Sequence, residues 1–463
     1  MGADRNNISP RQGRIRPAEY QAVHRGARDR VGLEAEYGGL GVFSALIDES
    51  ISLWQEGPAC LPPFERTFTV DEQAAREARL DQFLGSVEAE LRHLPRTRSE
   101  RQQVGCRITS AFERFAKSAL NLEDKHLELL LNDGFSTVAT QLARQARRFD
   151  PAVSIADILQ ASRNAWTAGG LQMLLGQDMR LTPSIFAYSM LYPYTDNYLD
   201  DSATPREAKL RFSDRFRRRL AGDRVAPTND REATIWRLVT MIEEQYSRTD
   251  WPQVFASLLA IHRAQENSLR WLHLGPSADE VDVVRFSFEK GGTSVLADGY
   301  LVAGSLSHEE AQSILGWGVL LQLIDDLQDL QRDLSERVLT VFTQAAGHQP
   351  LDELTTRTLC FGQKVMDRLV QMPEGSGVLR EMIQKSSWSL LIWSAGESSD
   401  LYTKKYLAEL ETHSPFRLNR LGERRQQLAR WTGPLARLFE SFLEGDEDEP
   451  VFPLLASSLL PRF

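Results

Sequence analysis

Two groups of aspartates could bind a metal ion, because each places several carboxylates close together after an apolar run. The first group lies in residues 196–201 and the second in residues 325–329. Helical residues four positions apart share one face, and carboxylates crowded there repel one another and cost free energy when buried. A hard divalent cation removes both penalties, and Mg²⁺ prefers oxygen ligands. The predicted metal ligands are Asp196, Asp200, Asp201, Asp325, Asp326 and Asp329.

The alternative is that both groups belong to acidic helix faces in water. The neighbouring residues argue against this, because the apolar segment 320–324 comes directly before the second group and tyrosines surround the first. Carboxylates near a helix C-terminus also oppose the helix dipole, which favours a bound cation.

Helix-start signals predict the elements that position these groups. Thr182 and Pro183 open the helix that leads to the first group, with threonine as N-cap and proline at the first helical position. Ser307 and Glu310 form a capping box for the helix that carries the second group. The segment 204–207 predicts a third helix start, with a capping-box glutamate.

A lysine, Lys290, precedes two glycines in the segment 288–294, between the two aspartate groups. Glycine disfavours helix, so we expect a helix break that offers backbone N–H groups to a phosphate, with the lysine as its counter-charge. The alternative is a solvated surface lysine. Arg206, Arg285 and Arg332 are further phosphate candidates, each with the same alternative.

Together these features resemble the class I isoprenoid synthase superfamily, which includes trans-prenyl diphosphate synthases, squalene and phytoene synthases, and class I terpene cyclases. Asp196 and Asp325 are 129 residues apart. The segments 288–294 and 299–304, followed by Gln322, resemble the Lys-Thr, Gly, Ala-Gly and Gln-x-x-Asp-Asp-x-x-Asp track of prenyl diphosphate synthases. The resemblance is clearest over residues 160–340.

The resemblance implies an all-α bundle around an apolar cavity, where aspartates hold Mg²⁺ ions that bind a substrate diphosphate. It also implies ionisation of an allylic prenyl diphosphate and formation of a terpenoid, as in a cyclase or lyase. The implied catalytic residues are Asp196, Asp200, Asp325, Asp329 and Lys290. The implied substrate-binding residues are Lys290, Arg206, Arg332, Tyr188, Tyr192 and Gln322. For the two tyrosines, ordinary aromatic core is the alternative to a pocket wall.

Chain elongation and head-to-head condensation are the alternative activities. Residues 202–206 follow the first group where prenyl diphosphate synthases have Arg-Arg-Gly, and the chain has no Gly-Gly-Lys, which makes elongation the second choice. The Asn-Asp-x-x-Ser-x-x-x-Glu motif of bacterial cyclases is also missing. Both groups can be read as Asp-x-x-x-Asp, as in squalene-type synthases.

Two further readings come from other classes of protein. Glu90 with His93 and Glu123 with His126 have the spacing of a di-iron carboxylate bundle. Helical periodicity, however, turns His93 away from the apolar stripe and towards water. A helical interaction protein without catalysis is the other reading, and it predicts no release of pyrophosphate.

Composition narrows the remaining classes. A net charge of −10 argues against nucleic acid as a partner. Three cysteines without Cys-x-x-Cys spacing indicate neither a disulfide framework nor a zinc site. No apolar run reaches the ~18–20 residues of a membrane span, and the arginine-rich start lacks the apolar core of a signal peptide. We expect a cytoplasmic protein and leave a homodimer open.

Helical periodicity dominates the chain and strand alternation is nearly absent, which predicts an all-α fold. We expect a flexible basic leader over residues 1–30 and one all-α domain over 31–463. Within the domain, the expected parts are a catalytic core at about 105–345, C-terminal helices at 346–443 and a solvated acidic tail at 444–463. The further predicted helices are Ile108–Ala119, Phe135–Phe149, Ala233–Ser247, Trp251–Trp271, Thr356–Met372, Val378–Ala395 and Gln426–Leu443.

Overall fold

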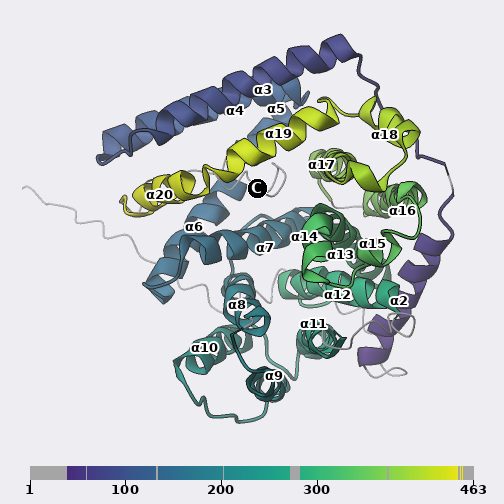
Figure 1. Ribbon diagram of the computed structural model, residues 1–463. Helices are drawn as coiled ribbons and strands as arrows, with labels where there is room; N and C mark the ends of the chain where they lie inside the picture. The colour runs from purple at the N-terminus through teal and green to yellow at the C-terminus, as the bar shows by residue number, and fades with distance from the viewer. Residues whose placement is uncertain are drawn as a thin grey trace, which may run out of the picture.

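The computed structural model describes residues 39–58, 60–131, 134–201, 203–271, 282–372, 375–446, 449 and 451. Within these residues every regular element is helical, which confirms the all-α prediction (Figure 1). The predicted leader, residues 1–30, lies outside the described residues.

The helices of the first half are α2 (Gly39–Gln55), α3 (Val70–Leu91), α4 (Arg98–Ala119), α5 (Asp124–Leu131), α6 (Phe135–Phe149), α7 (Ile155–Leu174), α8 (Pro183–Asp200), α9 (Arg206–Leu220) and α10 (Asp230–Gln245). Those of the second half are α11 (Pro252–Trp271), α12 (Val283–Ala303), α13 (His308–Gln328), α14 (Leu330–Glu336), α15 (Val341–Ala345), α16 (Asp352–Val370), α17 (Gly377–Glu397), α18 (Lys404–Glu411), α19 (Leu418–Ala429) and α20 (Thr432–Leu443).

All three predicted helix starts are confirmed, and two of them have the predicted caps. The Thr182 hydroxyl accepts a hydrogen bond from the Ile185 N–H at the start of α8, and Ser307 with Glu310 forms the capping box of α13. The third helix, α9, begins at Arg206 inside the predicted segment, but its predicted capping box is wrong, because Pro205 is the N-cap and makes no side-chain cap bond. Thr204 instead donates to Asp201, at 2.7 Å, in the turn that joins α8 to α9.

The predicted helix 426–443 is two helices, α19 and α20, with a break at Arg430 and Trp431. Pro434 lies in the first turn of α20, where it has no N–H to donate to the Arg430 carbonyl and its ring would clash with a continuous helix. The indole of Trp431 is buried at the break.

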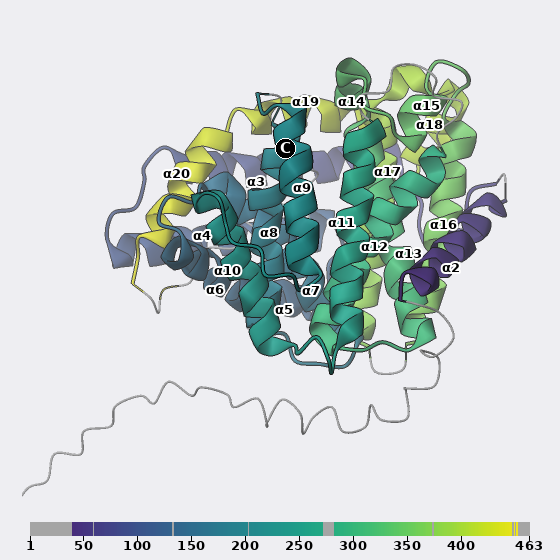
Figure 2. The same cartoon turned by 90° about the horizontal axis from the view of Figure 1, so that it is seen from below.

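Helices α12 and α13 form the most extensive helix pair in the described structure, and α11 packs on the other side of α12. Seen from below, α9, α11 and α12 stand next to one another (Figure 2). The close approach of α12 and α13 depends on glycines: a Cβ on Gly291 would lie 2.7 Å from the Gly318 carbonyl oxygen, and one on Gly318 would lie 2.5 Å from the Gly291 carbonyl oxygen.

The predicted helix break after Lys290 is therefore wrong, because α12 runs unbroken from Val283 to Ala303. The glycines serve close helix packing, which compensates for their low helix propensity. Inside a continuous helix the backbone N–H groups bond to carbonyls one turn earlier, so residues 291–294 do not offer them to a phosphate.

The predicted solvated tail is also wrong at Glu449, whose side chain is buried. The Arg101 guanidinium of α4 donates to both Glu449 carboxylate oxygens, at 2.7 and 3.0 Å. Arg144 of α6 donates to the Glu449 carbonyl oxygen at 2.7 Å. This part of the tail is therefore packed against the bundle.

Candidate functional site

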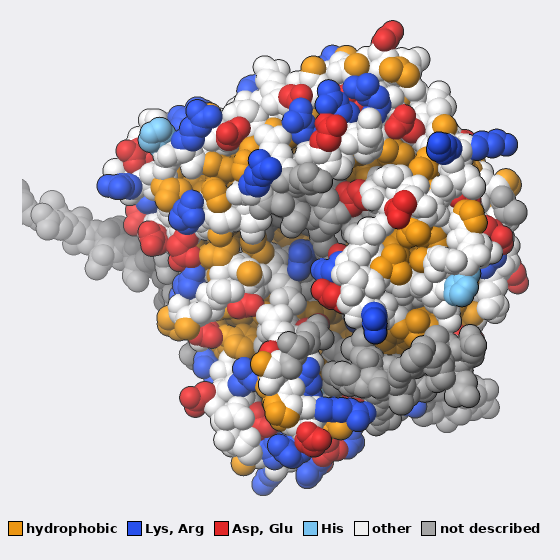
Figure 3. All heavy atoms as spheres, viewed as in Figure 1, with side chains coloured by type: hydrophobic (Ala, Val, Ile, Leu, Met, Phe, Trp, Pro, Cys, Tyr) orange, Lys and Arg blue, Asp and Glu red, His pale blue; other side chains and the backbone are white. Residues whose placement is uncertain are grey.

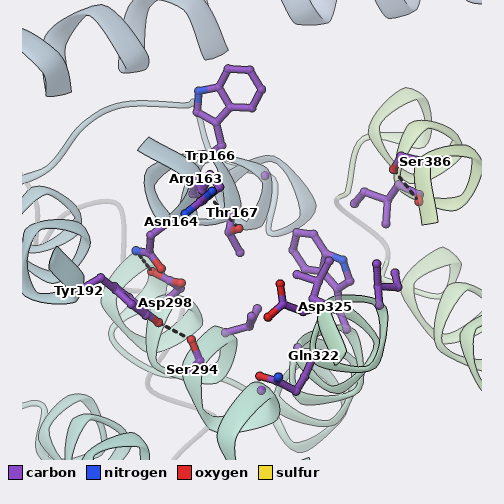
Figure 4. Close-up of a pocket in the computed structure, with 18 of the residues that line it drawn as sticks. Arg163, Asn164, Trp166, Thr167, Tyr192, Ser294, Asp298, Gln322, Asp325 and Ser386 are labelled. Carbon is purple, nitrogen blue, oxygen red and sulfur yellow. Dashed lines mark hydrogen bonds between the residues drawn. The ribbon is translucent and has the colours of Figure 1, made fainter. Parts of the chain in front are cut away.

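A cavity of about 480 Å³ opens between α5, α6, α7, α8, α11, α12, α13 and α17. Most of its wall is apolar and is formed by Leu130, Phe135, Trp166, Ile261, Val295, Trp317, Leu321, Ile324, Leu379, Met382, Ile383 and Leu390. Figure 4 shows polar side chains from several of these helices around the same space. Apolar cavities of this size with a few convergent polar groups are typical of small-molecule sites.

Both aspartate groups contribute a residue to this cavity, Asp196 from α8 and Asp325 from α13. Asp196 is half-buried, and its Oδ1 accepts hydrogen bonds from the Gln265 amide at 2.8 Å and the Thr195 hydroxyl at 3.1 Å. Gln265 lies on α11 and also lines the cavity, so its amide fixes the orientation of the Asp196 carboxylate.

Asp326 and Asp329 do not line the cavity. Asp326 is buried, and its two oxygens accept hydrogen bonds from Gln322 at 2.7 Å and Ser287 at 3.1 Å. Burial raises the pKa of Asp326 to about 7 despite these two bonds. Asp329 caps α13 and accepts a hydrogen bond from the Arg332 guanidinium at 2.6 Å.

The remaining predicted ligands differ in position. Asp201 is exposed at the end of α8, where its carboxylate accepts hydrogen bonds from the Ala203 N–H and the Thr204 hydroxyl. These hydrogen bonds lower the pKa of Asp201. The backbone of Asp200 belongs to α8, and its side chain lies outside the described residues.

Three of the predicted substrate-binding residues line the cavity: Lys290, Gln322 and Tyr192. Lys290 is half-buried on α12, and its charge counteracts the rise in the pKa of Asp326. Gln322 lies on α13 one turn before Asp326 and donates to it. Lys290 therefore brings positive charge to the cavity wall that holds Asp325.

The predicted phosphate-binding arginines lie elsewhere. Arg206 is exposed at the start of α9, and the Arg332 side chain is 60% exposed while it pairs with Asp329. Arg285 forms an ion pair with Asp48 of α2. None of the three lines the cavity.

The two predicted pocket tyrosines, Tyr188 and Tyr192, lie one turn apart on α8. Tyr188 lines only a second cavity, of about 30 Å³, whereas Tyr192 lines both this cavity and the large one. Their hydroxyls are 3.2 Å apart, and Tyr188 also donates to the Ser294 carbonyl oxygen at 3.2 Å. The Tyr192 hydroxyl bonds to that of Ser294 (Figure 4). Both rings are therefore tied to α12.

Sequence reasoning missed several polar residues of the cavity. One turn after another, α7 presents Gln160, Arg163, Asn164 and Thr167 to it, and this helical spacing could have been noticed in the sequence. Asp298, inside an apolar part of α12, is another such residue. The contact between Gln265 and Asp196 could not have been found, because it joins residues 69 positions apart.

One of the two Glu-x-x-His pairs considered for a di-iron site, Glu123 with His126, belongs to a group of possible metal ligands in the structure. Among the described residues, Glu123, His126 and Glu381 place possible ligand atoms within 4.8 Å of one another, whereas the aspartate groups do not form such a cluster of three. Lys125 and Lys385 both bind the Glu381 carboxylate, at 2.9 and 2.6 Å. These lysine contacts lower the pKa of Glu381 to about 2, so the carboxylate already has its cations. His93 is exposed, as predicted.

The outer surface shows charged side chains of both signs interspersed across the face in Figure 3, without one continuous basic area. No helix in the described part of the chain is both long and apolar enough to cross a membrane. Comparison with protein-family models, with curated proteins and with solved structures finds no match for this chain.

Proposed function

We propose that this chain is a Mg²⁺-dependent class I terpenoid synthase that ionises an allylic prenyl diphosphate and converts the resulting carbocation into a terpenoid. The observation that carries the proposal is that Asp196, Asp325 and Lys290 line the same, largely apolar cavity. These three residues come from α8, α13 and α12, and the proposed resemblance assigns all three to the diphosphate end of the site.

The donor set of the cavity fits Mg²⁺, because the described residues that line it offer carboxylate and amide oxygens but no cysteine or histidine. Asp196 and Asp325 would hold the ion, and its remaining positions would take water and diphosphate oxygens. Bound Mg²⁺ would neutralise the charge that develops on the departing diphosphate.

The residues of the chain supply the rest of the chemistry. The Lys290 ammonium would donate a charge-assisted hydrogen bond to the diphosphate, which strengthens as the C–O bond breaks and its electron pair leaves with the oxygen. Aromatic rings of Trp166, Tyr192 and Trp317 line the cavity, and ring quadrupoles favour a nearby cation. The apolar wall excludes water that would otherwise capture the carbocation.

The cyclase or lyase reaction is favoured over chain elongation by the position of Arg206. Elongation needs a second diphosphate site, and this arginine, a candidate for diphosphate binding, lies on the exposed start of α9 outside the cavity. Head-to-head condensation is the third choice, and a helical interaction protein without catalysis is the alternative from another class.

The test is release of pyrophosphate from C10 to C25 prenyl diphosphates with Mg²⁺, with the products identified by mass. Asp196→Asn and Asp325→Asn should each lower the rate by about 10²–10³-fold, as expected for loss of one electrostatic contact to the transition state. The matched control is Asp367→Asn, an exposed aspartate of α16, which should keep full activity. Absence of pyrophosphate release from every substrate would support the interaction protein instead.

A further inference from the structure

Asp298 is a carboxyl group in the cavity wall that the proposed ionisation does not use. It lies on α12 among apolar neighbours, and its side chain is fully buried. Its Oδ1 accepts a hydrogen bond from the Asn164 Nδ2 of α7 at 3.0 Å. Its Oδ2 is buried and has no hydrogen-bond partner among the described residues. Figure 4 shows this pair close to Tyr192 and Ser294.

A proton on the Asp298 carboxyl accounts for this environment. Burial raises the pKa of Asp298 well above its usual range, and the Asn164 hydrogen bond opposes the rise only in part. Lys290 lies eight residues earlier on α12, about 12 Å along the helix axis at 1.5 Å per residue, and does not neutralise the group. A protonated carboxyl carries one O–H donor, so Oδ2 is the oxygen with an O–H still to be used.

Helix packing alone does not require an acid at this position. Asn164 also donates to the Ser189 hydroxyl of α8 at 3.1 Å, which already ties α7 to α8. A serine or asparagine at position 298 could accept the Asn164 amide without a buried ionisable group. Buried polar atoms without partners are destabilising and uncommon, so this one points to a partner that arrives with the ligand.

We propose that Asp298 is a general acid that transfers its proton to a carbon–carbon double bond of an uncharged intermediate in the cavity, an inference that rests on the proposed function. The intermediate forms when the first carbocation loses a proton to the released diphosphate. In the step itself the Asp298 O–H bond breaks, the alkene electron pair forms a new C–H bond, and a second carbocation faces the Asp298 carboxylate.

The final carbocation then loses a proton from a neighbouring carbon, and its C–H electron pair forms the double bond of the product. Asp298 accepts this proton and regains its resting form, so that no additional reactant is consumed. A buried carboxylic acid suits this role, because it is neutral before the step and strongly favours an adjacent cation after it.

The first measurement uses the wild-type protein equilibrated in D₂O with Mg²⁺, in excess over a prenyl diphosphate so that each molecule turns over once. The acid then begins as O–D, and we expect one deuterium in the product, located by mass spectrometry and NMR. A product without deuterium would overturn the proposal. A wild-type protein that releases no pyrophosphate would refute the proposed function itself, which is a separate outcome.

The second measurement compares two variants in the same experiment. Asp298→Asn keeps the shape of the side chain but has no acidic proton, so it should still release pyrophosphate and should yield an unlabelled isomer of the wild-type product. The control, Asp367→Asn, should give the labelled wild-type product. A labelled wild-type product from Asp298→Asn would overturn the proposal. Should that variant fail to fold, as judged by circular dichroism, the wild-type label still decides.

Discussion

Adjacent aspartates in the second group have different environments. Asp325 lines the cavity, whereas Asp326 is buried and satisfied by Ser287 and Gln322. Successive helical residues point about 100° apart, so the two side chains of such a pair cannot serve one site equally. An acidic run in a helix therefore does not by itself predict that all of its carboxylates face the same site.

The resemblance to class I isoprenoid synthases nevertheless implied one specific feature of the two groups. Asp196 and Asp325 were expected in one cavity, and both line it, together with Lys290 and Tyr192. The prediction succeeded because the apolar runs before each group identify helices buried in the core. Their role as metal ligands stays a prediction, which the variants at these two positions test.

The Gln265 amide should support magnesium binding through its hydrogen bond to Asp196. Gln265→Leu keeps the approximate size of the side chain but removes the hydrogen bond to Asp196. Since loss of a group that orients a metal ligand typically costs 10–100-fold in metal affinity, the Mg²⁺ concentration for half-maximal pyrophosphate release should rise by about that factor.

The control for this variant is Gln363→Leu, because Gln363 also donates to an aspartate, Asp367, but outside the cavity. Its magnesium dependence should match wild type. An unchanged magnesium dependence in Gln265→Leu would show that the bond to Asp196 serves packing alone.

The helix pair α12 and α13 shows what local propensity cannot predict. Two consecutive glycines suggested a break, yet the helix continues because α13 lies so close that no larger residue fits. The predicted bounds of α6, Phe135–Phe149, match the structure at both ends, whereas the helix predicted at Ile108–Ala119 begins ten residues earlier, at Arg98. Amphipathic spacing is a local property, whereas the approach of a second helix depends on residues that are distant in sequence.

Gly291→Ala should therefore destabilise the protein. The new Cβ would lie 2.3 Å from the Gln322 Cβ and 2.7 Å from the Gly318 carbonyl oxygen, so α12 and α13 would have to move apart. Overpacking of this kind typically costs about 1–3 kcal/mol. Urea unfolding would measure the loss.

Gly85→Ala is the matched control. Gly85 is exposed on α3, and a Cβ there meets nothing within 4 Å. This variant should gain about 0.5–1 kcal/mol from better helix propensity. Equal stability changes in the two variants would contradict the packing role of Gly291.

Helices α4 and α6, from the N-terminal third of the chain, bind a residue near its C-terminus. Composition and periodicity predicted the helical class, but the acidic tail was assigned to solvent. The Arg101–Glu449 ion pair joins residues 348 positions apart. Nothing in the local sequence distinguishes Glu449 from its acidic neighbours, because only the folded arrangement of α4 and α6 supplies its partners.

This contact makes stability depend on pH in a defined direction. The Arg101 guanidinium lowers the pKa of Glu449 to about 2, from its usual value of 4.5. A carboxylate with a lowered folded-state pKa stabilises the fold fully above its unfolded pKa and loses this contribution as pH falls through its folded pKa. The contribution of Glu449 should therefore be complete at neutral pH and decline from about pH 4.5 towards pH 2.

Glu449→Gln should lower the free energy of unfolding at pH 7 by about 1.5–3 kcal/mol, the range for hydrogen bonds to charged groups. The difference from wild type should shrink between pH 4.5 and pH 2, because the wild-type carboxylate is then protonated. Urea unfolding at pH 7, 4 and 2.5 measures it. Glu444→Gln, at an exposed position of the same segment, should stay within about 0.5 kcal/mol of wild type. A difference for Glu449→Gln that is the same at every pH would mean that shape, and not charge, holds the C-terminal segment against α4.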